Sequence, residues 1–126
     1  MNKKLLEEIA ERWITIWNDG SIDDFLSIFS DEIVHCSRLI NSVHPESNGT
    51  LYGKAALREY WSQIKTKSAF SNFKILGVHF FENRIILFLK SQVNHQSIIV
   101  LLTVNEDMLI SHSEASFSAM SINKLN

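Results

Sequence analysis

The chain has 126 residues, of which 45% are hydrophobic and 21% charged, and its formal net charge at pH 7 is -2. This length supports one domain with a core of its own, so we expect a single domain over residues 1–126. The charge balance excludes a strongly basic surface of the kind that binds nucleic acid or an anionic membrane.

The cysteine count and the amino-terminal residues indicate a cytoplasmic protein. Cys36 is the single cysteine, which excludes an internal disulfide and fits a reducing compartment. Glu7, Glu8 and Glu11 interrupt any apolar run near the amino terminus, so we expect no signal peptide there. No stretch approaches the roughly 20 apolar residues of a membrane-spanning helix, so we expect no membrane partner.

The first thirty residues predict two amphipathic helices. Ile9, Trp13 and Trp17 recur every four residues, which gives the first helix a wide apolar stripe. Gly20 is expected to end it. A second, short helix is expected to begin at Ser21, with Asp24 three residues on in a variant of the capping box. Its apolar stripe comprises Ile22, Phe25, Leu26 and Phe29.

A strand is predicted over residues 32–40, because this segment is short and contains β-branched side chains. The alternation of a strand places Ile33, His35 and Ser37 on one face. It places Val34, Cys36 and Arg38 on the other.

A loop with turn residues follows at 41–50, and residues 51–52 are expected to form a very short strand. Residues 54–65 then predict a third helix, because their apolar residues recur at helical spacing. This stripe comprises Ala56, Leu57, Tyr60, Trp61 and Ile64.

Four apolar runs, at 72–81, 84–93, 97–104 and 108–117, predict antiparallel strands, because joints of two or three residues separate them. Helices followed by strands indicate an α+β fold. The middle two runs are apolar on both faces. The helices can cover one face only, so we expect the outer face of the sheet to form a homodimer.

The order of these motifs resembles the nuclear transport factor 2-like superfamily, and most closely its SnoaL-like branch, which includes polyketide cyclases. The resemblance rests on W-x3-W-N-D-G-S-I-D-D-F-x3-F-S-D-E-I-V, on G-x-x-A-L-R-E-Y-W and on the four strands. It implies a cone-shaped, cystatin-like roll, in which a curved antiparallel sheet wraps around three N-terminal helices. A pocket then lies between helix and concave sheet. Fold alone does not imply an activity.

The resemblance also assigns positions for catalytic groups. Steroid isomerases of this superfamily place a tyrosine on the first helix, a carboxylate on the first strand and an acid on a later strand. Here the matching positions hold Trp13, Ser37 and the aliphatic residues 100–102, so that chemistry is not expected. The last strand resembles K-I-x-E-H-W-x-x-x-D at Leu109 and His112, but Phe117 stands where the cyclases often have an acid.

His112 and Glu114 are the predicted catalytic pair. Two residues apart on a strand, they share a face, and a histidine oriented by a carboxylate suits general acid–base catalysis. We expect His112 to point into the same hollow as His35, which with Ser37 would bind the oxygen of a ligand. The alternatives are an exposed polar strand end for the pair and a hydrogen-bonded core histidine for His35.

The remaining pocket residues are expected to be aromatic and to bind a small hydrophobic molecule; they are Trp13, Trp17, Tyr52, Trp61 and Phe73. Tyr52 and Arg58 would lie at the pocket mouth, and the equal alternative for Arg58 is a solvated residue of the third helix. No cofactor is expected, and no metal, since His35, His112 and Glu114 lack the close spacing of a ligand motif.

Three hypotheses for function remain open. The first is an enzyme for isomerisation, cyclisation or dehydration by proton transfer, and the second a binding protein that uses the same pocket. The third is a protein-interaction module whose cavity is filled by Trp17, Trp61 and Phe73. An open cavity that reaches His112 would favour the first two, and a filled cavity would favour the third.

Overall fold

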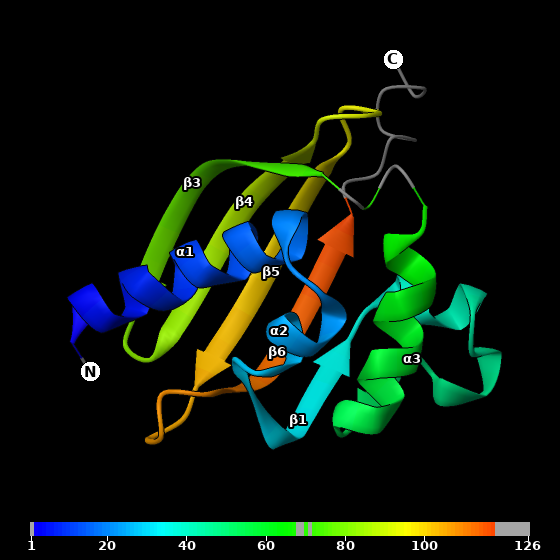
Figure 1. Ribbon diagram of the computed structural model, residues 1–126, viewed down its shortest axis with the longest axis horizontal. Coiled ribbons are helices and arrows are strands. Elements are labelled where there is room, and N and C mark those ends of the chain that lie inside the picture. The colour runs from blue at the N-terminus through cyan, green and yellow to red at the C-terminus, as the bar shows by residue number, and fades with distance from the viewer. Residues whose placement is uncertain (1, 68–69, 71, 118–126) are drawn as a thin grey trace.

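The structure, a computed structural model, describes residues 2–67, 70 and 72–117 (Figure 1). The other residues of the expected 1–126 domain lie outside this description. In chain order the helices and strands are α1 (Lys3–Asp19), α2 (Ile22–Leu26), β1 (Phe29–Cys36), β2 (Thr50–Tyr52), α3 (Lys54–Lys65), β3 (Phe73–Phe81), β4 (Arg84–Ser91), β5 (Ser97–Val104) and β6 (Ile110–Phe117).

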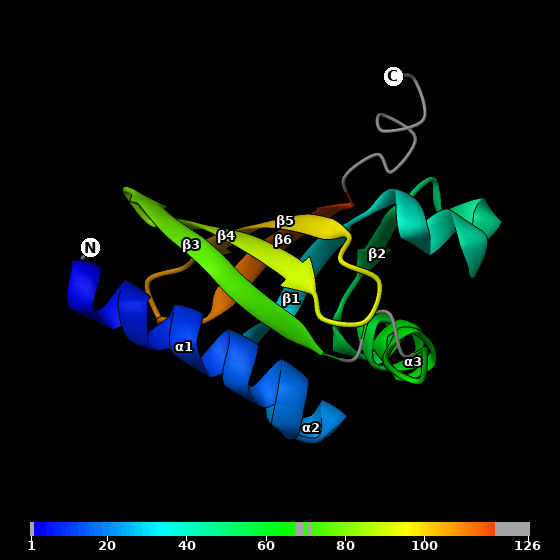
Figure 2. The same cartoon turned by 90° about the horizontal axis from the view of Figure 1, so that it is seen from above.

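The six strands form one sheet in the order β2-β1-β6-β5-β4-β3. Every neighbouring pair is antiparallel except β1 and β6, which run parallel. The sheet is strongly curved and does not close, and all three helices lie against its concave side (Figure 2). The predicted α+β cone is therefore confirmed. None of the described helices is long and apolar enough to cross a bilayer.

The helix boundaries follow the predicted local signals. The Asn2 side chain caps α1, and the predicted capping box of Ser21 and Asp24 opens α2. Gly20 ends α1 in an extended conformation rather than a left-handed one. Glycine is required there by close approach, since an added Cβ would lie 2.9 Å from the carbonyl oxygen of Ile16.

The first strand is placed earlier than predicted. It begins at Phe29, which therefore belongs to β1 and not to the stripe of α2. It ends at Cys36, because the Ser37 hydroxyl accepts a hydrogen bond from the Leu39 N–H and starts a 3₁₀ helix, Arg38–Ser42. A second 3₁₀ turn, Pro45–Ser47, follows within the predicted loop.

The core is centred on aromatic rings from all three helices. Phe25 of α2 packs edge-on against Trp17 of α1 and Trp61 of α3, with 4.9 Å between ring centroids in both pairs. Trp17 also stacks on Phe73 at the start of β3. These rings are buried, and edge-on and offset-stacked contacts are the favoured geometries for aromatic pairs. The cluster therefore joins the helices to the concave face of the sheet.

One polar side chain fixes the first helix to the sheet edge. The Asn18 amide nitrogen donates to the Phe73 carbonyl at 2.8 Å, and the Asn18 amide oxygen accepts from the Phe73 N–H at 2.9 Å. This side chain thus satisfies both backbone groups of the first residue of β3, in the way that a neighbouring strand would.

We predict that Asn18→Ala lowers the free energy of unfolding by about 1–3 kcal/mol, because it leaves two partly buried backbone groups without partners. Urea unfolding of both proteins would measure this. Thr15→Ala, an exposed change on the same helix, is the control and should cost less than roughly 0.5 kcal/mol. Equal losses in the two variants would contradict the assigned role of Asn18.

Candidate functional site

A small hollow lies between the helices and the concave face of the sheet. Three tryptophans, Trp13, Trp17 and Trp61, line it together with Phe73, as the sequence predicted. They are the only three tryptophans of the chain. His35 is among the few polar residues in this lining. The walls are therefore almost entirely aromatic and aliphatic.

The free space in this hollow is about 40 Å³. A single water needs roughly 10–15 Å³ on this measure, so the space holds a molecule of only a few heavy atoms. Pockets for drug-sized ligands are typically about 300–1,000 Å³. Trp17, Trp61 and Phe73 line this space and narrow it without filling it. It is therefore neither the open cavity reaching His112 nor the filled cavity that the three hypotheses distinguish.

His35 is buried at the polar end of the hollow. Its Nδ1 is hydrogen-bonded to the Ser113 hydroxyl at 3.0 Å, and its ring packs against Tyr60 and Trp61. The pKa of His35 is lowered from its usual 6.5 to about 4, mainly by burial and also by the nearby charge of His112, while a hydrogen bond with the Ser113 backbone opposes the shift. His35 is therefore a neutral imidazole at neutral pH.

Tyr60 and Ser37 extend this polar end. Burial raises the pKa of Tyr60 to about 12, against the opposing effect of a side-chain hydrogen bond with Ser37. Tyr60 lines the hollow directly, whereas Ser37 reaches it only through Tyr60. The polar end thus offers hydroxyl and imidazole groups that are uncharged at neutral pH.

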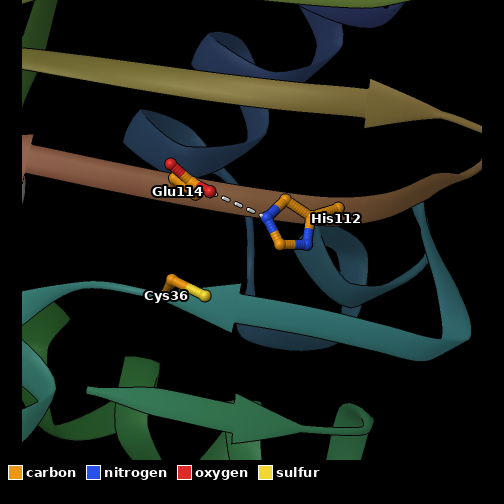
Figure 3. A group of neighbouring side chains, drawn as sticks. All are labelled: Cys36, His112 and Glu114. Atoms are coloured by element: carbon orange, nitrogen blue, oxygen red, sulfur yellow. Dashed lines mark hydrogen bonds and ion pairs between the residues drawn. The ribbon is translucent and has the colours of Figure 1, made fainter. Parts of the chain in front are cut away.

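The expectation that His112 shares this hollow with His35 is wrong. His35 lies opposite Ser113 on β6, whereas His112 lies opposite Val34 and Glu114 opposite Cys36. His112 and Glu114 therefore lie on the outer face of the sheet. They do form the predicted pair there, with His112 Nε2 donating to Glu114 Oε1 at 3.0 Å (Figure 3).

A β-bulge in the last strand explains this placement. Val104 pairs with Ile110 and Thr103 with His112, so Ser111 has no opposite residue on β5. An extra residue reverses the alternation of side chains beyond it. Ile110 is buried, yet the next buried residue is Ser113 and not His112. No glycine or proline marks the bulge, so the sequence offered no signal that Ser113 faces the hollow.

Two further predicted positions also lie outside the hollow. Tyr52 is 72% exposed on β2 and, opposite Val34, stands on the outer face with His112. Arg58 forms an ion pair with Asp23 on the surface. Neither residue lines the hollow.

Comparison of the sequence with known proteins finds no matching family model and no matching curated protein. The fold, in contrast, is shared with many solved structures. A SnoaL-like protein of unknown function from Burkholderia thailandensis is 17% identical with a TM-score of 0.84, covering 94% of this chain and 98% of its own.

Two other solved structures show how widely this fold is used. A protein with a ketosteroid isomerase-like fold from Catenulispora acidiphila, in complex with trimethylamine, is 11% identical with a TM-score of 0.68, covering 91% of this chain and 88% of its own. A de novo designed protein with a curved β-sheet is 13% identical with a TM-score of 0.76, covering 99% and 93%. The predicted nuclear transport factor 2-like fold is thus confirmed. Because a designed protein shares it, the fold itself specifies no activity.

The burial of His35 predicts a pH-dependent stability. Above about pH 6.5 His35 is neutral in both states. As pH falls towards 4, the unfolded chain binds a proton there that the native state does not, so stability falls and then levels off below about 4. The loss is roughly 3 kcal/mol, since one unit of pKa difference is worth about 1.4 kcal/mol.

Urea unfolding between pH 4 and 7 would measure this loss. His35→Gln should flatten the curve by that amount, because it removes the titrating group. His79→Gln, which replaces an exposed histidine on β3, is the matched control and should keep the wild-type curve. Parallel curves for the wild type and His35→Gln would contradict the prediction.

Proposed function

We propose that the protein binds a compact, uncharged and mainly apolar molecule in the aromatic hollow, with one polar group of that ligand directed to His35 and Ser113. The observation that carries this proposal is the buried His35–Ser113 hydrogen bond at one end of an otherwise apolar wall. A few convergent polar groups in an apolar pocket are typical of small-molecule sites.

The electrostatics of the hollow favour a neutral ligand. None of the described residues that line it is a carboxylic acid. The same burial that keeps His35 neutral disfavours any other positive charge without a partner. The trimethylamine bound in the Catenulispora protein is an amine of suitable size. Its cationic form would be disfavoured in this chain for want of an acidic partner.

Binding is better supported than proton-transfer catalysis. The predicted catalytic pair, His112 and Glu114, lies on the opposite face of the sheet from the hollow. Within the hollow, His35 is a base with a pKa of about 4, too low for efficient proton abstraction at neutral pH. The volume also excludes ligands of steroid size unless the aromatic side chains move.

Self-association is the second candidate function, carried by the apolar outer face of the sheet. Phe88 on β4 lies directly opposite Ile99 on β5, and both are more than 40% exposed. On β3, Leu76 is exposed next to Gly77, which lies opposite Phe88, and Phe81 is exposed at the other end of the strand pair, opposite Arg84. Apolar patches of this kind mark interaction sites, and a second copy of the chain would bury this one. This is the homodimer that the sequence predicts.

The ligand proposal predicts selective binding of small neutral probes. Pyrazole and thiophene are five-membered rings of similar size, and only pyrazole forms strong hydrogen bonds. Pyrazole should therefore bind about three- to tenfold more tightly, as expected for one hydrogen bond. Protonated trimethylamine should not bind. Tryptophan fluorescence would report occupancy, because all three tryptophans line the hollow.

Adjacent residues of β6 provide the matched variants for this experiment. Ala115→Leu fills the hollow and should abolish binding. Ser116→Leu adds similar bulk at the neighbouring exposed position, which faces the other way, and should bind as the wild type does. The proposal would be contradicted if Ala115→Leu and Ser116→Leu bound the probes equally well. It would also be contradicted if the wild-type chain bound neither pyrazole nor thiophene.

Self-association predicts a dimer whose mass depends on the outer face. Phe88→Lys combined with Ile99→Lys should convert it to a monomer, because it places charges at the centre of the patch. Light scattering with size-exclusion chromatography would measure the mass. Leu5→Lys, at a residue of α1 that is as exposed as Phe88, is the control and should remain dimeric. A wild-type chain that is monomeric at high concentration would refute this function.

A further inference from the structure

Three side chains of metal-ligand type converge on the outer face of the sheet, away from the hollow. Cys36 comes from β1, and His112 and Glu114 come from β6 (Figure 3). The two strands are parallel neighbours, and Cys36 lies directly opposite Glu114. One ligand atom from each residue lies within 4.8 Å of the other two. Residues distant in sequence are thus brought together by strand register.

We propose that Cys36, His112 and Glu114 bind a divalent transition-metal ion of the zinc type. Thiolate, imidazole and carboxylate are together the ligand types that Zn²⁺ uses in proteins. Magnesium and calcium prefer sites made of oxygen ligands alone, which this cluster does not provide. Binding releases the thiol proton, because the thiolate is the ligand form. It also requires the His112 ring proton to sit on Nδ1 instead of Nε2, because the nitrogen that binds the ion carries no proton.

The backbone geometry needs little change to close around the ion. Zinc–ligand bonds of about 2.0–2.3 Å in a tetrahedron place the ligand atoms roughly 3.3–3.8 Å apart. His112 Nε2 and Glu114 Oε1 are 3.0 Å apart and therefore already near this spacing. The Cys36 thiol is half-buried and hydrogen-bonded to the Thr50 hydroxyl at 3.6 Å. Metal binding would require the thiol to leave this hydrogen bond and move closer to His112 and Glu114, from within the 4.8 Å that now separates the ligand atoms.

The fourth coordination position faces solvent. A broad hollow of about 680 Å³ begins at the cluster, with Cys36 and Glu114 in its lining. His112 and Glu114 are also partly exposed, their side chains being 36% and 49% accessible. An ion held here would keep a water ligand, as in zinc sites with three protein ligands. An exposed ion pair contributes little to stability, so the fold does not depend on this arrangement.

Cobalt titration of the untagged 126-residue chain tests the proposal. Co²⁺ replaces Zn²⁺ in such sites, and a thiolate ligand gives a charge-transfer absorption in the near ultraviolet. Cys36 is the only cysteine, so this band reports Cys36 alone. We expect saturation at one equivalent and displacement by Zn²⁺. Cys36→Ser should abolish the band.

Variants of the other two ligands separate a built site from binding by the thiol alone. His112→Gln and Glu114→Gln should each weaken Co²⁺ binding more than tenfold, since even residues that only orient a ligand are worth about 10- to 100-fold. His79→Gln, an exposed histidine elsewhere in the sheet, should leave it unchanged. Equal affinity in the wild type and His112→Gln would overturn the proposal, as would the absence of a thiolate band.

A second measurement needs no substitution. Stoichiometric Zn²⁺ should slow the alkylation of Cys36 in the wild-type chain by more than tenfold, and a chelator should restore the rate. An unchanged rate would overturn the proposal even if a variant failed to fold.

Discussion

The contacts of Phe25 with Trp17 and Trp61 are the constraint on which the rest of the structure depends. Each ring comes from a different helix, and the 4.9 Å centroid distances leave no room between them. Interiors packed at this density transmit any displacement to their neighbours. The cluster therefore sets how closely the helices approach the curved sheet. That distance in turn fixes the volume of the hollow and the burial of His35.

The last strand divides the polar chemistry of the protein between two faces. Beyond the bulge at Ser111, side chains alternate strictly, so Ser113 joins His35 inside while His112 and Glu114 lie outside. The inner group is buried and uncharged, and the outer group is partly exposed and ionisable. A strand with regular pairing would have placed the ionisable pair in the hollow, where burying its charges would have been costly. The bulge therefore separates the aromatic hollow with His35 and Ser113 from the outer cluster of Cys36, His112 and Glu114.

Much of the fold could be predicted because its signals are local and periodic. Trp13 and Trp17 recur at helical spacing, Ser21 and Asp24 form a capping box, and short joints define the four-strand meander. The aromatic lining followed from the same periods, whereas the inward direction of His35 rested on the resemblance to the superfamily. The position of His112 could not be predicted. One extra residue in a strand reverses the face to which every later side chain points, and Ser111 has no backbone preference that would mark such a bulge. The size of the hollow depends on side-chain packing across three helices, which no local pattern encodes.

Function in this fold must be sought at particular side chains. A designed protein has the same curved architecture, which shows that helices can cover one face of a bent sheet without any selection for function. In this chain three tryptophans line the hollow and leave about 40 Å³. Under the proposed binding function, a space so small would select ligands by size before it selects them by chemistry. The hydrogen-bonded imidazole of His35 would then discriminate among those that fit, because an unmatched polar group costs most where water is excluded.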